Sequence, residues 1–94
     1  MQVKFDWDEG NNTKSYSKHG ASIQESESMF QDVFRIDFSD PFHSTNEFRY
    51  VSIGQSSRPR LLFAAWTLRD RLVRVISIRP ASLKERKIYE KNKA

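Results

Sequence analysis

The 94-residue sequence contains no cysteine, only three glycines and three prolines, and two histidines. The lack of cysteine excludes disulfides, thiolate metal sites and a cysteine nucleophile. The glycines are scattered, so there is neither a Gly-rich phosphate loop nor a Gly-x-Ser-x-Gly nucleophile elbow. No apolar run approaches the roughly 20 residues that a membrane-spanning helix needs. Most enzyme classes are therefore excluded, and no contact with a membrane is expected.

Cofactor and targeting signals are equally scarce. His19 and His43 have no second ligand at the spacing of a metal site. We therefore expect no metal and no other cofactor. The polar N-terminal sequence MQVKFDWDEG has no apolar core of a secretory signal. A cytoplasmic protein is the resulting expectation.

What the sequence does contain is an uneven distribution of charge. Residues 58–94 carry eleven Lys or Arg and three Asp or Glu. Residues 1–57 carry five Lys or Arg and nine Asp or Glu. A basic half on an otherwise acidic chain favours a polyanionic partner, such as RNA or an acidic protein. The alternative is that these charges only keep the surface soluble. A chain of this length predicts one domain, residues 1–94.

Hydropathy patterns predict an α+β fold. Alternating or continuous apolar runs indicate four strands joined by short turns, which favours an antiparallel meander; the expected strands are residues 34–38, 48–53, 61–66 and 72–78. Ahead of them we expect a short strand and two helices, at residues 3–7, 8–19 and 22–30. Ser22 with Glu25, and Ser82 with Glu85, form capping boxes. The second box begins a final helix to about residue 91, with Leu83, Lys87 and Ile88 as its apolar stripe. The early helices should cover one sheet face and leave the other partly open.

Two arginines in the last predicted strand attract attention, because an unpaired buried guanidinium is costly. On a regular strand Arg74 faces the same way as Leu72, Ile76 and Ile78, and Arg79 faces the opposite way. A bend at residues 78–80 would be needed to bring the two arginines together. One hypothesis then puts Arg74, Arg79, Glu85 and Tyr89 around a single phosphate. The other makes Arg74–Glu85 and Arg86–Glu90 structural ion pairs.

The remaining chemistry is proton transfer and electrostatic stabilisation. These suffice, without a metal, for cleavage of RNA by its own 2′-hydroxyl, which needs a base, an acid and cations on the phosphate. Arginine supplies bidentate phosphate contacts. His19 can be such a base, or can complement the end of the first helix.

Several stretches together are similar to one known family: FDWDE (5–9), KHG (18–20), RYVSIG (49–54), RLLFAAWTLR (60–69) and RVISIRPASLKERKIYE (74–90). With these, the chain resembles the BrnT toxins of bacterial type II toxin–antitoxin systems. The resemblance implies a RelE-like fold and a ribonuclease that inhibits translation. It also implies neutralisation by a BrnA-like ribbon-helix-helix antitoxin, in a heterotetramer built on an antitoxin dimer that alone contacts operator DNA.

The family's motifs include Lys18, His19, Arg74, Arg79, Glu85, Arg86 and Tyr89. Together with the distribution of charge, they lead us to expect the following roles. Arg74 and Arg79 would hold the scissile phosphate. Proton transfer would fall to Tyr89, Glu85 or His19, and the RNA backbone would be held by Arg60, Lys18, Lys84 and Arg86. A non-catalytic module that binds RNA or an acidic protein through the same surface is the alternative. Ile78 and Pro80 depart from the family, in which a small residue usually precedes the second arginine.

Overall fold

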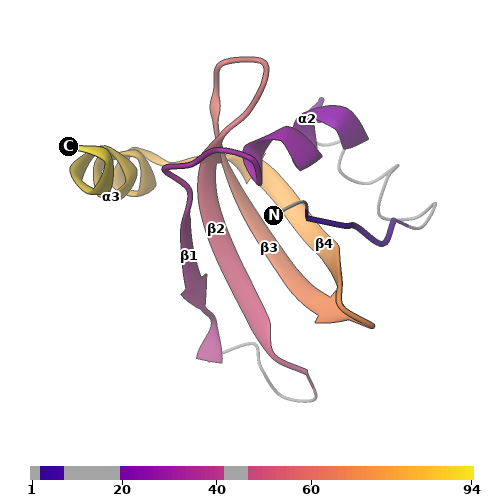
Figure 1. Cartoon of the computed structure of the whole chain (residues 1–94). Coiled ribbons are helices and arrows are strands. Elements are labelled where there is room, and N and C mark those ends of the chain that lie inside the picture. Colours follow the sequence, from indigo (N-terminus) through magenta and orange to yellow (C-terminus); the bar gives the residue numbers. More distant parts are fainter. Residues whose placement is uncertain (1–2, 8–19, 42–46) are drawn as a thin grey trace.

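The computed structural model describes residues 3–7, 20–41 and 47–94. Its centre is an antiparallel four-stranded sheet whose strand order follows the chain (Figure 1). The strands are β1 (Ile36–Ser39), β2 (Arg49–Gln55), β3 (Leu61–Arg69) and β4 (Leu72–Pro80). The α+β class and the meander predicted from the sequence are confirmed.

Two helices lie against different faces of this sheet. Helix α2 (Ile23–Met29) packs on one face, and helix α3 (Leu83–Lys93) lies beside one end of the sheet (Figure 1). The larger core lies on the α2 side and contains Ala21, Met29, Phe30, Leu62, Ala64, Val73, Val75 and Ile78. A smaller core on the other face contains Ile53, Leu61 and Tyr89. The second face is therefore covered by α3 at one end, as expected for a partly open sheet.

Strand β4 contains a bulge. Ala65 of β3 pairs with Ser77, whereas the next residue of β3, Trp66, pairs with Val75. Ile76 is therefore an extra residue in β4, and its insertion reverses the alternation of side chains beyond it.

The bulge changes the position of the two arginines. Side chains that face the α2 core occur on both sides of it, at Val73, Val75 and Ile78. Arg74 and Arg79 consequently share the opposite face, the one that α3 partly covers. The prediction of opposite faces was wrong because it assumed an unbroken period of two, and no bend at residues 78–80 is required.

The start of α2 follows the predicted pattern only in part. Gly20 has φ +65°, the left-handed conformation expected where a preceding helix ends. That predicted helix, residues 8–19, lies outside the described residues. Ser22 caps α2, and its Oγ accepts a hydrogen bond from the Glu25 N–H at 3.1 Å. The Glu25 carboxylate, however, does not complete a capping box and instead binds groups from the β2–β3 hairpin.

Helix α3 begins with the complete capping box that was predicted. Ser82 Oγ accepts from the Glu85 N–H at 3.2 Å, and Glu85 Oε1 accepts from the Ser82 N–H at 2.8 Å. The predicted apolar stripe was wrong, since Leu83 is 68% exposed and Tyr89 is the buried residue of the helix. The single aromatic ring, and not the aliphatic side chains, attaches α3 to the sheet.

The N-terminal stretch adds a short connection to the edge of β4. Phe5 makes an isolated parallel bridge with Val73 instead of a regular strand. The Asp6 N–H donates to the Val73 carbonyl at 2.8 Å, which places Asp6 beside Arg74. Within the described residues, no helix is long and apolar enough to span a membrane.

Candidate functional site

Arg79 is held in a fixed orientation on the open face. Its Nη1 and Nη2 donate to the two carboxylate oxygens of Glu85, each at 2.8 Å. The guanidinium also lies over the Phe63 ring, 4.1 Å from its centroid. The bidentate pair with Glu85 leaves the Arg79 side chain little rotational freedom, yet that side chain remains 41% exposed. Arg79 can therefore contact a ligand without first being ordered by it.

Glu85 serves two groups at once. It accepts from Arg79 and from the Ser82 N–H at the start of α3. The hydrogen bond from Arg79 lowers the pKa of the Glu85 carboxyl, against the opposing effect of burial. At neutral pH the group is ionised and cannot donate a proton. Its contacts suit orientation of Arg79 better than proton transfer.

Arg74 lies on the same face but in a different neighbourhood. Its Nη1 is 3.6 Å from Asp6 Oδ2, and its side chain is 20% exposed. Thr67 pairs with Arg74 and Phe63 pairs with Arg79. The two arginines are thus separated by four residues along β3, about 13 Å at 3.3 Å per residue.

This geometry changes both hypotheses about the arginines. The predicted Arg74–Glu85 ion pair is wrong, because Glu85 binds Arg79 and Arg74 lies beside Asp6. Arg74, Arg79, Glu85 and Tyr89 do not surround one point either. The strand positions of the two arginines are about 13 Å apart, which does not favour contact of both with a single phosphate.

Tyr89 is buried between α3 and the sheet. Its hydroxyl donates to Asp32 Oδ2 at 2.5 Å, and the ring is 4% exposed. Burial, followed by the hydrogen bond to Asp32, raises the pKa of Tyr89 to about 12. Asp32 also accepts from the Phe34 and Gln55 N–H groups. Tyr89 therefore anchors α3 to the α2–β1 turn, and its ring is buried in the small core with Ile53 and Leu61.

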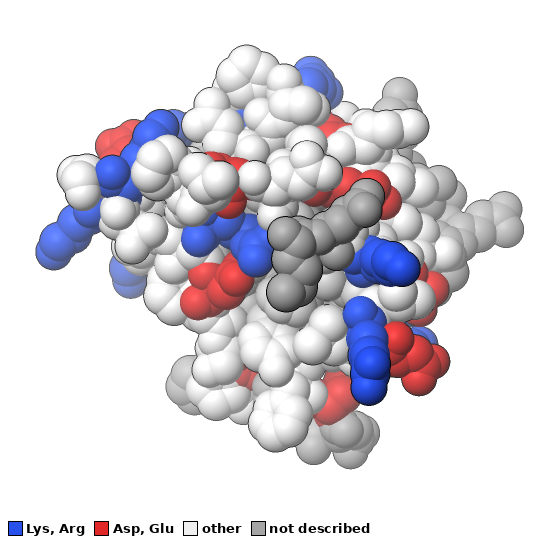
Figure 2. All heavy atoms as spheres, in the orientation of Figure 1, with Lys and Arg blue, Asp and Glu red and all other residues white. Residues whose placement is uncertain are grey.

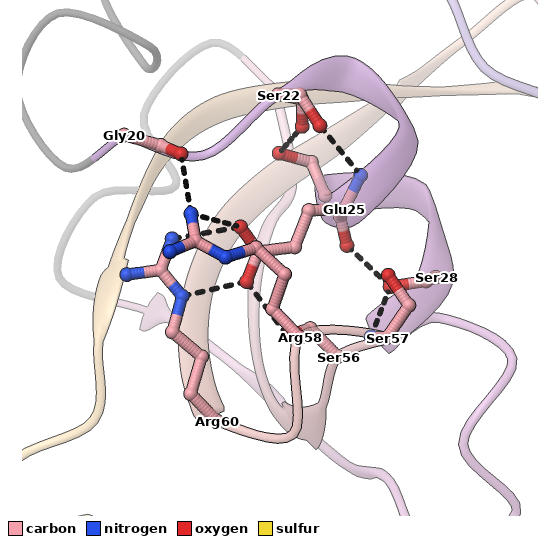
Figure 3. Close-up of polar contacts among 9 residues, drawn as sticks. Gly20, Ser22, Glu25, Ser28, Ser56, Ser57, Arg58 and Arg60 are labelled. Atoms are coloured by element: carbon pink, nitrogen blue, oxygen red, sulfur yellow. Dashed lines mark hydrogen bonds and ion pairs between the residues drawn. The ribbon is translucent and has the colours of Figure 1, made fainter.

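A second charged cluster joins α2 to the β2–β3 hairpin (Figure 3). Glu25 is 2% exposed. Its Oε2 accepts from Arg60 Nε at 2.6 Å and from Ser56 Oγ at 2.7 Å, and its Oε1 accepts from Arg60 Nη2 at 2.7 Å. Arg58 Nη1 lies 3.7 Å from the same carboxylate. The Arg60 hydrogen bond is the main cause of a lowered pKa at Glu25, so the carboxylate is ionised at neutral pH.

Sequence reasoning missed this cluster. Glu25 was assigned to a capping box, and Arg60 to the RNA backbone. The structure shows that Arg60 donates from Nε and Nη2 to the two carboxylate oxygens of Glu25, and its side chain is only 26% exposed. A pair separated by 35 positions leaves no periodic signal in one sequence, so only the folded chain reveals it.

Of the other predicted RNA contacts, two lie on α3 and one lies outside the described residues. Lys84 and Arg86 are exposed on α3, a helix with five Lys or Arg and two Glu. Figure 2 shows cationic side chains at the left edge, where α3 lies, and mixed charges over the rest of that face. Lys18 and His19 lie outside the described residues. In the parts of the chain that are described, no group of three or more His, Asp or Glu side chains could hold a metal ion.

Comparison with known proteins agrees with the architecture. The model of a family described as the ribonuclease toxin BrnT of type II toxin–antitoxin systems matches residues 7–85. Among solved structures, the crystal structure of the Brucella abortus ribonuclease toxin BrnT is similar, with a TM-score of 0.59 and 22% identity over 85% of this chain and 97% of that chain. No curated protein sequence matches.

Proposed function

The chain belongs to the BrnT family of ribonuclease toxins from type II toxin–antitoxin systems, and we propose that it cleaves RNA by attack of the RNA's own 2′-hydroxyl. The observation that carries the proposal is the pair of arginines, Arg74 and Arg79, on one face of the sheet. Preorganised guanidinium groups stabilise the charge that develops on a phosphate in the transition state. Inhibition of translation in the cytoplasm follows from the loss of the RNA.

Roles within the site follow from the contacts. Arg79, held by Glu85 and Phe63, stabilises the scissile phosphate, and Arg74 holds another phosphate of the same strand. Glu85 is a positioning residue, and Tyr89 is an anchor for α3. Among the candidates from the sequence, His19 remains for proton transfer. Its ordinary pKa near 6.5 suits a group that must both accept and donate a proton at neutral pH.

The cognate antitoxin is the second partner. We propose a BrnA-like ribbon-helix-helix protein whose dimer binds two copies of this chain and carries the complex to operator DNA. Exposed apolar side chains support a protein partner, since Phe48 is 77% exposed and Phe38 is 41% exposed. Induction of this chain with and without a neighbouring ribbon-helix-helix reading frame tests this part. Growth arrest that the second protein does not relieve would contradict it.

The catalytic proposal is tested by substitution of the two arginines. Arg79→Ala should lower RNA cleavage by about 100-fold or more, because it removes a charged donor from the scissile phosphate. Arg74→Ala should lower cleavage by a smaller factor, because it removes a contact with a phosphate that does not react. Arg69→Ala is the control, since Arg69 is an exposed arginine that also lies beside a carboxylate, Glu47, at 3.9 Å. Cleavage that survives both substitutions would overturn the proposal.

The mechanism has its own test. Replacement of the nucleotide at the cut site by its 2′-deoxy form should abolish cleavage, and EDTA should leave the cleavage rate unchanged. Cleavage of the 2′-deoxy substrate would exclude attack by the 2′-hydroxyl. A chain that binds RNA with steep salt dependence but never cuts it would favour the non-catalytic module.

A further inference from the structure

The β2–β3 hairpin carries two arginines that face one buried carboxylate, Glu25 of α2. Arg58 and Arg60 both approach Glu25, so two guanidinium groups share one carboxylate. Arg60 takes both carboxylate oxygens at hydrogen-bond distance, whereas Arg58 remains 3.7 Å away. The cluster therefore retains one net positive charge, and Arg58 carries it at the surface.

Arg58 is the outer member of the cluster. Its side chain is 63% exposed, and its Nη1 donates to the Gly20 carbonyl at 3.2 Å. Within the described residues, its Nε and Nη2 make no hydrogen bond. Figure 3 shows both guanidinium groups on the same side of Glu25, with that of Arg58 reaching the Gly20 carbonyl. Arg58 is thus held at one corner and has donors left for a ligand.

The hairpin that presents Arg58 is itself braced against α2. Ser56 Oγ donates to Glu25, and the Ser57 N–H donates to Ser28 Oγ at 2.8 Å. These contacts hold the backbone just before Arg58, and the Arg60–Glu25 pair holds it just after. A preorganised side chain loses less conformational entropy when it binds.

We propose that Arg58 binds a backbone phosphate of RNA beside the turn at Gly20, and that the buried Glu25–Arg60 pair positions it. A guanidinium with parallel N–H donors matches the oxygens of a phosphate. Arg60 is the internal brace of this site, in place of the RNA contact predicted from the sequence. The inference rests on the proposed ribonuclease function and extends the RNA path from the open sheet face to the β2–β3 hairpin.

The test measures binding separately from cleavage. The probe is a fluorescein-labelled single-stranded 2′-O-methyl RNA, which cannot be cut by its own 2′-hydroxyl. Arg58→Ala should weaken binding by about 5- to 30-fold and lower the slope of log Kd against log salt by about 0.7, the effect of one lost phosphate contact. The melting temperature should change little, because Glu25 keeps its hydrogen bonds to Arg60 and Ser56. Arg69→Ala, at the far end of β3, is the control and should bind like the wild-type chain.

A positioning role for Glu25 predicts non-additive effects. Ser56→Ala and Glu25→Gln loosen the brace, and Glu25→Gln combined with Arg58→Ala should bind no more weakly than Arg58→Ala alone. With cleavable RNA, Arg58→Ala should raise KM and leave kcat within about threefold. Ser56→Ala keeps the charged pair and serves if Glu25→Gln fails to fold.

The outcomes separate this inference from the ribonuclease proposal. If Arg58→Ala binds RNA like the wild-type chain while Arg79→Ala abolishes cleavage, the hairpin site is wrong and the proposed function stands. If Arg58→Ala lowers kcat and leaves binding intact, the assignment as a phosphate contact is wrong. If the wild-type chain neither binds nor cuts RNA, both proposals fail.

Discussion

At the scale of single residues, carboxylates determine how each arginine is presented. Arg60 binds Glu25, Arg79 binds Glu85, and Arg74 lies beside Asp6. A bidentate partner fixes the direction of a guanidinium. Arg60 is thereby turned inward to a buried group, whereas Arg79 is fixed at the surface and remains available to a ligand.

The buried Glu25 predicts a specific dependence of stability on pH. Its pKa in the folded chain is lowered from 4.5, chiefly by the Arg60 hydrogen bond. The contribution to stability is therefore fully present above pH 4.5 and is lost as pH falls through the lowered pKa. Glu25→Gln should lower the free energy of unfolding by about 3 kcal/mol at pH 7. It should also weaken the dependence of that free energy on pH at acidic pH.

Urea denaturation at neutral and acidic pH measures this effect. Glu47→Gln is the control, because the Glu47 side chain is 38% exposed and lies 3.9 Å from Arg69. Such a surface pair contributes about 1 kcal/mol or less. Equal losses of unfolding free energy in the two variants would show that the buried Glu25 cluster contributes no more to stability than a surface ion pair.

At the scale of elements, α3 depends on a single aromatic anchor. Tyr89→Phe removes the hydroxyl that Asp32 accepts and should lower the free energy of unfolding by about 1.5–3 kcal/mol. RNA cleavage measured well below the melting temperature should fall by less than about threefold, since the anchor touches no substrate in the proposed site. A loss of about 100-fold would restore Tyr89 as a catalytic group.

The Tyr89 anchor also predicts behaviour at alkaline pH. Its pKa is raised from 10.0 to about 12 in the folded chain. The unfolded chain therefore loses the proton first, and the contribution to stability falls as pH rises from about 10 towards 12. Tyr89→Phe should remove this decline. Tyr50→Phe is the control, because the Tyr50 ring stacks on Trp66 and its hydroxyl has no hydrogen-bond partner among the described residues.

At the scale of the whole molecule, the uneven charge predicts salt-sensitive binding. The proposed RNA contacts of Arg58, Arg74 and Arg79 should together give a slope of about 2 for log Kd against log salt. Affinity for single-stranded RNA should then fall by roughly 16-fold between about 50 and 200 mM salt. Fluorescence anisotropy over a salt series measures the slope. A slope near zero would mean that apolar or stacking contacts dominate instead.

Much of the architecture was predictable because it is local. Alternating or continuous apolar runs identified the four strands, and Ser82 with Glu85 identified the start of α3. Local signals failed where a distant partner decided the outcome. The Glu25 carboxylate left its capping position for Arg60, and the ring of Tyr89 was buried in place of Leu83.

The sequence by itself determined the elements, their order and the supply of arginines, because hydrophobic period, caps and charge are properties of neighbouring residues. Only the tertiary structure decided how those arginines are used. The insertion of Ile76 against β3 brought Arg74 and Arg79 to one face. The approach of α2 to the β2–β3 hairpin turned Arg60 inward and left Arg58 outside. Both depend on pairing between distant segments, which the residues of either segment alone do not specify.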